Sequence, residues 1–249
     1  MKNLILIAIL FNASIFADYS NHKDSKEVID ELVNEHGFEE SYVINVLKQA
    51  KKRKTALNSV ARPAEKTKTW DDYRAIFLKK KRISDGKKFI QTNITVLERA
   101  EKEFGVPKEV ITAILGVETD YGNIMGSYRV IDSLTTLGFD DPRRSKFFKS
   151  ELIQFFILTR ENNLDILKVK GSYAGAMGYG QFISSSYRAY AIDFDGDGYV
   201  DLFNSLEDAI GSTANYLKRH GWKKEGSIVT RVYPNLSLIH ISEPTRPMN

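Results

Sequence analysis

Residues 113–122 read AILGVETDYG, an apolar run that ends on the carboxylate of Glu118. Upstream, Pro107 suits the first position of a helix, where its missing N–H leaves no hydrogen bond unmade. Downstream, Gly122 suits a helix stop. The sequence therefore predicts a helix of about three turns over 106–118 that stops near Gly122. We expect the rest of the chain to fold around Glu118 and hold it in place.

The carboxyl group of Glu118 has an apolar setting in this predicted helix. At helical spacing it lies above Ile114 and Leu115, which places it against an apolar wall. Such burial disfavours the ionised form and keeps a proton available for general-acid catalysis near neutral pH. The alternative is a solvated carboxylate at the helix end, or one paired with an arginine. Asp120 is a weaker candidate acid, because it lies on another face of the helix.

The first 17 residues have the layout of a signal peptide. One lysine precedes the apolar run 4–11, and small residues then lead to Ala17. The run is too short to span a bilayer permanently. We therefore expect export to the periplasm, with no stable membrane span in the mature protein. An uncleaved N-terminal helix is the alternative.

The composition restricts the chemistry that the chain can carry. With 42% hydrophobic and 27% charged residues among 249, it has ordinary globular usage. It has no cysteine, which excludes disulfides, thiolate sites and lipidation at cysteine. A net charge of +4 suits a partner with carboxylates, such as the peptide stems of a cell wall, and does not indicate nucleic acid. We expect a monomer without an organic cofactor.

Hydrophobic spacing along the chain predicts a mainly α fold, because no alternating strand pattern, heptad or internal repeat is present. The run Trp70–Phe77 predicts an amphipathic helix whose aromatic side chains lie in the core. Ser205, followed three residues later by Asp208, has the form of a capping box. The other predicted elements are a helical pair over 25–54 broken at 36–38, a linker over 61–69, and helices over 87–104, 132–137, 143–162 and 205–220.

The segment 193–201 matches the first nine positions of an EF-hand calcium loop. Aspartates bunched at alternate positions repel one another without a cation, so the pattern predicts a hard metal ion, calcium first. An acidic turn is the alternative. Position twelve holds Asn204 where a bidentate glutamate is usual, so Glu207 or Asp208 is expected to supply the missing carboxylate. The predicted ligands are Asp193, Asp195, Asp197, the carbonyl of Tyr199, Asp201 and Asp208.

A segment rich in small residues, 171–182, lies between the Glu118 helix and the aspartate loop. Small residues let another chain approach the backbone closely. Tyr173 offers a flat surface for a sugar ring, while Ser172 and Gln181 offer polar contacts. From the residues alone, a segment for tight helix packing and a binding groove are both open.

Several motifs in this order resemble the lytic murein transglycosylase B family. They are GVET at 116–119, MGSYRV at 125–130, DPRR at 141–144, the segment 171–182, YRAYA at 187–191 and the aspartate loop. The resemblance runs from about Val28 to Trp222. It implies a lysozyme-like catalytic core with an EF-hand-like calcium loop, acting on the glycan strands of peptidoglycan.

Carried over by position, the resemblance makes Glu118 the sole catalytic acid and places Ser172, Tyr173 and Gln181 in the glycan-binding segment. It implies non-hydrolytic cleavage between N-acetylmuramic acid and N-acetylglucosamine, giving 1,6-anhydro products. The alternatives are a hydrolytic muramidase and a non-catalytic wall-binding protein. The expected layout is a signal peptide (1–17), a helical region with a linker (18–69), a catalytic domain (70–233) with its calcium loop (193–204), and a tail (234–249).

The tail departs from the family pattern. Residues 236–249 have neither helical nor strand spacing and resemble translated adapter sequence. We therefore expect a truncated gene joined to foreign sequence, with a divergent natural tail as the alternative.

Overall fold

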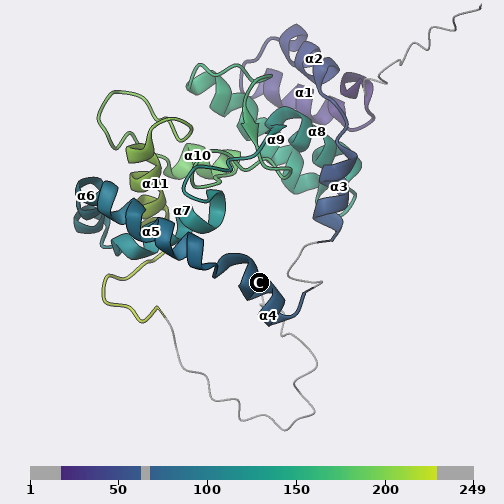
Figure 1. Cartoon of the computed structure of the whole chain (residues 1–249). Coiled ribbons are helices and arrows are strands. Elements are labelled where there is room, and N and C mark those ends of the chain that lie inside the picture. The colour runs from purple at the N-terminus through teal and green to yellow at the C-terminus, as the bar shows by residue number, and fades with distance from the viewer. Residues whose placement is uncertain (1–17, 63–67, 229–249) are drawn as a thin grey trace, which may run out of the picture.

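The structure, a computed structural model, describes residues 18–62 and 68–228 and is mostly helical (Figure 1). The predicted signal peptide, 1–17, and the predicted tail, 234–249, both lie outside the described residues. The first elements are η1 (Tyr19–Asn21), α1 (Ser25–Asn34), α2 (Glu40–Gln49), α3 (Lys54–Ala61), α4 (Trp70–Phe77), α5 (Lys80–Thr92), α6 (Ile94–Phe104) and α7 (Lys108–Thr119).

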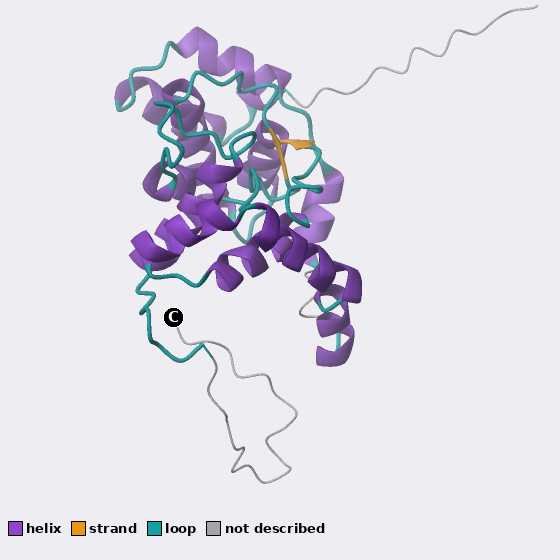
Figure 2. Ribbon diagram, turned by 60° about the vertical axis from the view of Figure 1, so that its left-hand side comes forward, coloured by secondary structure: helices purple, strands orange, loops and turns teal. Residues whose placement is uncertain are grey.

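The later elements include the two short strands of the described chain. In order they are β1 (Tyr128–Arg129), α8 (Val130–Asp140), α9 (Ser145–Glu161), β2 (Lys170–Gly171), α10 (Ser184–Tyr190) and α11 (Leu206–Arg219). The strands pair antiparallel, with Tyr128 opposite Gly171 (Figure 2). The prediction of a mainly α fold is confirmed.

The predicted cap at the start of α11 is present. The hydroxyl oxygen of Ser205 accepts a hydrogen bond from the backbone N–H of Asp208 at 3.1 Å. This bond satisfies one of the amides that a helix start leaves without a partner. α11 then continues to Arg219, close to the predicted end.

The helix predicted over 87–104 is wrong in its extent. α5 begins earlier, at Lys80, and the chain breaks at Asn93 before α6 starts. The side-chain amide of Asn93 donates to the carbonyl of Phe89 at 2.9 Å. Asparagine competes in this way for backbone partners, which favours helix ends over helix interiors.

The prediction that the aromatic side chains of α4 lie in the core is also wrong. α4 buries none of its side chains among the described residues, and Trp70 is 71% exposed. The rings contact one another instead, with the centroids of Tyr73 and Phe77 5.2 Å apart. The amphipathic pattern identified an apolar face correctly, but the described residues cover that face only in part, with the Arg82 guanidinium 5.9 Å from the centroid of the Phe77 ring.

One hydrophobic core joins the N-terminal helices to the middle of the chain. α1, α2 and α3 pack with α8 and α9, and the largest fully buried side chains come from both groups. Burying each such side chain stabilises the fold by about 1.5–3 kcal/mol. Among them are Leu32, Leu47, Leu137, Phe148, Phe155 and Phe156.

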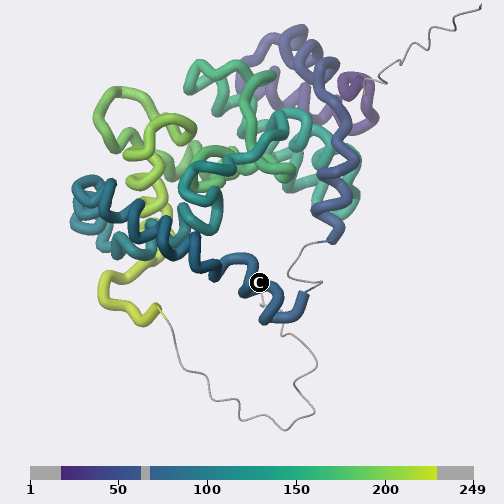
Figure 3. The backbone as a smooth tube through the Cα atoms, viewed as in Figure 1, coloured from purple at the N-terminus to yellow at the C-terminus, as the bar shows by residue number. Residues whose placement is uncertain are grey.

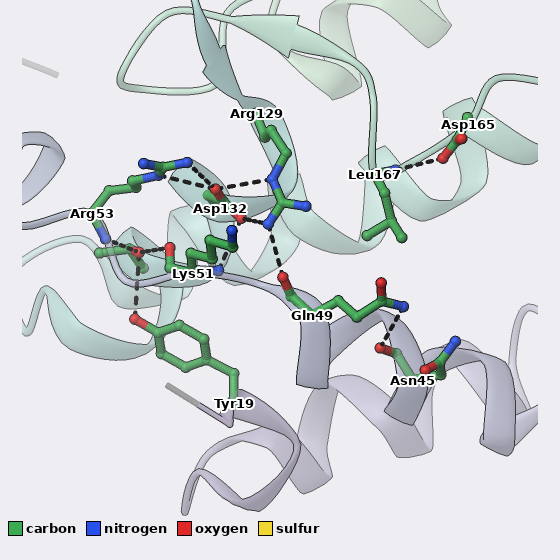
Figure 4. Close-up of polar contacts among 10 residues, drawn as sticks. Tyr19, Asn45, Gln49, Lys51, Arg53, Arg129, Asp132, Asp165 and Leu167 are labelled. Atoms are coloured by element: carbon green, nitrogen blue, oxygen red, sulfur yellow. Dashed lines mark hydrogen bonds and ion pairs between the residues drawn. The ribbon is translucent and has the colours of Figure 1, made fainter. Parts of the chain in front are cut away.

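Asp132 at the start of α8 ties the N-terminal region to this core (Figure 4). Its side chain is fully buried and accepts hydrogen bonds from the guanidinium groups of Arg53 and Arg129. The backbone N–H of Lys51 donates to it at 2.9 Å. A buried carboxylate is tolerated when charged and hydrogen-bonded partners replace its water. Arg129 belongs to β1, so this network also fixes the small sheet.

A second core lies under the predicted catalytic helix. α11 packs beside α6 and α7, although they are far apart in sequence (Figure 3). Leu97 of α6, Ile111 and Leu115 of α7, and Ile210 of α11 are fully buried in it. α5 also packs on α7, so neighbouring helices fix α7 on more than one side.

Membrane-spanning helices do not occur in the described part of the chain. Within residues 18–62 and 68–228, no helix combines the length and the apolar character needed to cross a bilayer.

Candidate active site

Glu118 lies in the last turn of α7. Pro107 stands at the cap before the helix, one position earlier than its predicted place in the first turn. Directly after Thr119 the chain becomes left-handed, with φ of 52° at Asp120 and 61° at Tyr121. This conformation is uncommon for residues other than glycine. The helix therefore ends in a sharp reversal immediately after Glu118 and Thr119.

A pocket of about 390 Å³ opens beside Glu118. Its wall is largely apolar, and Glu118 is the one charged side chain among the described residues that line it. The other lining residues are Ile114, Gly180, Gln181, Phe182, Ile183, Ser186, Thr213, Tyr216 and Leu217.

This setting changes the acidity of Glu118. The open mouth of the pocket leaves the side chain accessible to solvent. The surrounding protein nevertheless removes part of the hydration of the carboxylate, and this desolvation raises the pKa of Glu118 above its ordinary value. The predicted apolar wall is present in Ile114, while Leu115 is buried in the core behind the helix. The group is thus suited to hold and give a proton.

Gln181 is the predicted binding residue that the structure brings to Glu118. It has a left-handed backbone, with φ of 51°, and lines the same pocket. Its side-chain amide donates to the carbonyl of Met125 at 3.2 Å and to that of Gly178 at 3.0 Å. These bonds hold the amide in place, so Gln181 is a preorganised polar group in the wall of the pocket.

Ser172 and Tyr173 lie outside the lining of this pocket. The hydroxyl of Ser172 accepts from the backbone N–H groups of Ala174 and Ala176 and so shapes a turn. The side chain of Tyr173 is 39% exposed. The Ser172 turn packs tightly on Gly126, where an added Cβ would come within 2.6 Å of the Ser172 nitrogen. Ser172 therefore lies next to residues 125–126, the connection in which the Met125 carbonyl accepts the hydrogen bond from Gln181.

Several pocket residues were missed from the sequence. Ser186 comes from α10, while Thr213, Tyr216 and Leu217 come from α11. The ring of Tyr216 meets that of Phe182 edge to face, with centroids 5.7 Å apart. The spacing of Thr213, Tyr216 and Leu217 in the sequence indicates only that they belong to an amphipathic helix. The packing of α11 on α7 is what brings them close to Glu118.

The aspartate loop, residues 193–201, places three carboxylates close together. Oxygen atoms of Asp193, Asp195 and Asp197 lie within 4.8 Å of one another. Gly196 and Gly198 have φ of 82° and 93°, and their N–H groups donate to the two oxygens of Asp193. Three clustered oxygen ligands in a glycine-shaped loop fit a hard cation such as calcium.

Asp208, a predicted ligand, contacts the backbone of the aspartate loop. Its carboxylate is buried and accepts hydrogen bonds from the N–H groups of Phe194, Asp195 and Asp201. Burial raises its pKa, and the three amides act in the opposite direction. Asp208 therefore anchors both ends of the loop through the backbone. Glu207, the alternative ligand, pairs with Arg99 at 3.0 Å.

The remaining predicted ligands lie on the second half of the loop. Asp201 accepts hydrogen bonds from the N–H groups of Phe203 and Asn204, so its side chain shapes the turn that follows. The side chain of Tyr199 is 75% exposed, which leaves its carbonyl as the group relevant to a cation. Neither residue belongs to the three-carboxylate cluster.

Comparison with known proteins gives the same family in sequence and in structure. The profile of the family described as "Transglycosylase SLT domain" matches residues 20–243, which extends into the segment predicted to be a tail. The chain is 42% identical over 216 residues to membrane-bound lytic murein transglycosylase B of Escherichia coli (strain K12). That match covers 83% of this chain and 60% of the relative, so the chain spans less than two thirds of the relative's length.

Two solved structures were determined with ligands that bear on the site. One is the Escherichia coli lytic transglycosylase Slt35 in complex with calcium, 42% identical with a TM-score of 0.78 over 84% of this chain and 67% of that one. The other is SltB3 from Pseudomonas aeruginosa in complex with NAG-NAM-pentapeptide. It is 28% identical with a TM-score of 0.69, over 81% of this chain and 54% of that one.

Proposed function

Because this chain belongs to the family of transglycosylase SLT domains, we propose that it is a lytic transglycosylase that cleaves peptidoglycan. The bond is the β-1,4 linkage between N-acetylmuramic acid and N-acetylglucosamine, and Glu118 is the catalytic acid. The names of the relatives support the substrate class. The observation that carries the proposal is Glu118 itself, a carboxyl group with a raised pKa in an apolar pocket.

The single carboxylate argues for a reaction without a second acidic residue. Ordinary glycosidases hold two carboxyl groups roughly 5–9.5 Å apart, one as acid and the other as nucleophile or base. Among the described residues that line the pocket, Glu118 has no acidic neighbour. Asp120 is close in sequence, but its carboxylate pairs with Arg82 at 3.5 Å. One group must therefore act first as acid and then as base.

The proposed reaction uses Glu118 in both roles. Its carboxyl group gives its proton to the glycosidic oxygen as the bond to C1 of the muramyl residue breaks, and the N-acetyl oxygen of the substrate stabilises the developing positive charge. The carboxylate then takes the proton of the muramyl C6 hydroxyl as that oxygen bonds to C1. The product is a 1,6-anhydro sugar, and Glu118 ends protonated. A held intramolecular hydroxyl outcompetes water through orientation.

Binding of the glycan is proposed to use the polar and flat groups around the pocket. Gln181 and Tyr216 lie in its wall and would contact the sugar nearest Glu118. Ser172 and Tyr173 lie beyond the 125–126 connection and would contact sugars further along the strand. Because murein is the substrate of the named relatives, we place the activity in the periplasm, in agreement with the signal pattern in 1–17.

We also propose that the aspartate loop holds a structural calcium ion. Asp193, Asp195 and Asp197 would supply carboxylate oxygens, and the carbonyl of Tyr199 would add a neutral one. Calcium would neutralise the repulsion between the aspartates and thereby stabilise the loop. A related transglycosylase was solved in complex with calcium, which supports this assignment.

The products of the reaction test the proposed function. Purified protein is incubated with peptidoglycan in isotopically labelled water, and the released muropeptides are weighed by mass spectrometry. A transglycosylase gives unlabelled anhydro products that lack one water. Labelled products with a reducing end would instead make the chain a hydrolytic muramidase, and binding without any product would make it a wall-binding protein.

A further inference from the structure

Thr119, the residue after Glu118, contacts the segment that leads into residues 180–182 of the pocket wall. Its side chain is 1% exposed. The hydroxyl lies 2.8 Å from the carbonyl oxygen of Tyr179 and 3.2 Å from that of Leu115 in its own helix. A hydroxyl has one hydrogen to donate, and the shorter distance favours Tyr179 as its acceptor. The same oxygen accepts from the N–H of Gly122 at 3.0 Å.

Tyr179 is also held from its other sides. Its backbone N–H donates to the carbonyl of Leu202 at 3.0 Å. Its ring packs on Gly122, where an added Cβ would come within 2.0 Å of a ring carbon. The residues that follow Tyr179 are Gly180, Gln181 and Phe182, which form one wall of the pocket. The Thr119 hydroxyl therefore joins this wall to the end of α7.

The hydrogen bond from Thr119 to Tyr179 lies next to the left-handed residues that follow α7, so it helps to hold their conformation. Asp120 and Tyr121 hold an uncommon backbone conformation, and such conformations persist where surrounding contacts determine them. The Thr119 hydroxyl lies inside the reversal, with Gly122 on one side and Tyr179 on the other. Without it, the last turn of α7 would lose its direct hydrogen bond to residue 179 and could shift relative to the wall formed by 180–182.

We propose that Thr119 is a positioning residue, whose hydroxyl sets the distance between Glu118 and the wall formed by 179–182. This inference rests on the proposed role of Glu118 as the acid. A proton donor must lie within hydrogen-bond reach of the glycosidic oxygen, and a displacement of about 1 Å can cost on the order of 100-fold in rate. Thr119 is buried and is not among the residues that line the pocket, so its proposed role is to position Glu118.

The helix offers a matched control for a test of this role. Thr112 is also in α7 and is 3% exposed, but its hydroxyl has no hydrogen-bond partner among the described residues. Thr112→Val and Thr119→Val remove the same group from the same helix. The change at Thr112 breaks no hydrogen bond, whereas the change at Thr119 removes the link to Tyr179.

Steady-state kinetics on soluble glycan fragments provide the first readout. We expect Thr119→Val to lower kcat on the order of 100-fold with little change in KM, while Thr112→Val stays near wild type. Thr119→Ser keeps the hydroxyl and should restore most of kcat. If Thr119→Val matches Thr112→Val, or if Thr119→Ser fails as fully as Thr119→Val, the positioning role is wrong.

A second readout does not depend on turnover. The carboxyl group of Glu118 is titrated by NMR with isotope-labelled glutamate in wild type and in the Thr119→Val, Thr119→Ala and Thr112→Val variants. Loosening of the pocket would leave the carboxyl group less desolvated, so the pKa of Glu118 should fall toward its ordinary value in both Thr119 variants and stay raised in Thr112→Val. Tyr216 is the other titratable side chain in the described lining, and it is present in every variant.

These readouts distinguish failure of the positioning role of Thr119 from failure of the proposed transglycosylase activity. A raised pKa that survives in a folded Thr119 variant overturns the positioning role, whatever the activity. If wild type cleaves no glycan but the pKa falls only in the Thr119 variants, the proposed function fails and the structural link stands. A lower melting temperature in Thr119→Val with unchanged kcat and an unchanged titration would reduce Thr119 to a packing role.

Discussion

Gln181 and Glu118 line one pocket, although β1, α8, α9 and β2 separate them in the chain. Gln181 is held by the carbonyl of Met125, just beyond the reversal that ends α7. The acid and its polar neighbour are therefore attached to the same short connection. A ligand that reaches Glu118 would therefore meet an amide that is fixed in place.

Charge in the pocket should control the pH range of activity. The raised pKa of Glu118 means that its proton, needed in the first step, is lost as pH rises through that pKa, so kcat/KM falls on the alkaline side. Ser186→Asp adds a negative charge to the lining and should raise the pKa further, moving this limb to higher pH. Ser186→Asn has the same shape without the charge, and equal pH–rate profiles for the two variants would contradict the assignment of the limb to Glu118.

Calcium should stabilise the protein through the aspartate loop. Saturation at about a hundred times the dissociation constant adds roughly 2.7 kcal/mol to the free energy of unfolding, so a chelator should lower Tm. In the double variant Asp193→Asn with Asp195→Asn, the chelator should no longer lower Tm. Glu31, Glu35 and His36 form another cluster of possible ligands among the described residues, so Glu31→Gln with Glu35→Gln is the control that should keep it. A calcium response that follows the control pair would place the ion elsewhere.

Asp132→Asn should destabilise the whole fold. Removing one partner of a buried ion pair costs about 3–5 kcal/mol, and the partly exposed guanidinium groups of Arg53 and Arg129 favour the lower end. Urea unfolding measures the change. The surface pair of Lys26 and Asp30 offers a control, because Asp30→Asn should leave the midpoint almost unchanged. Equal midpoints for the two variants would show that the Asp132 network contributes little.

The local features of the site could be predicted from the sequence. The helix around Glu118, its apolar neighbour Ile114 and the cap at Ser205 follow from spacing and residue type within a few turns. The left-handed position of Gln181 and the place of Tyr216 do not, because they depend on packing between helices distant in sequence.

The errors have physical causes as well. The pattern in α4 defines an apolar face but not the surface that covers it, so Trp70 was predicted to be buried and is exposed. Asp208 was predicted as a ligand because the loop lacks a carboxylate at position twelve. That ligand role stays a prediction. The sequence pattern did not indicate that three backbone N–H groups donate to the Asp208 carboxylate.

The central claim is that Glu118 carries the proton in a non-hydrolytic cleavage of peptidoglycan. The most direct measurement compares the muropeptides released by wild type, Glu118→Gln and Asp120→Asn, with glycan binding measured in parallel. Asparagine tolerates the left-handed backbone at Asp120, so this neighbouring variant is a matched control. We predict 1,6-anhydro products from wild type and Asp120→Asn, and a loss of about 10²–10⁴-fold or more in Glu118→Gln with binding retained. Near-normal release of anhydro products by Glu118→Gln would contradict the claim.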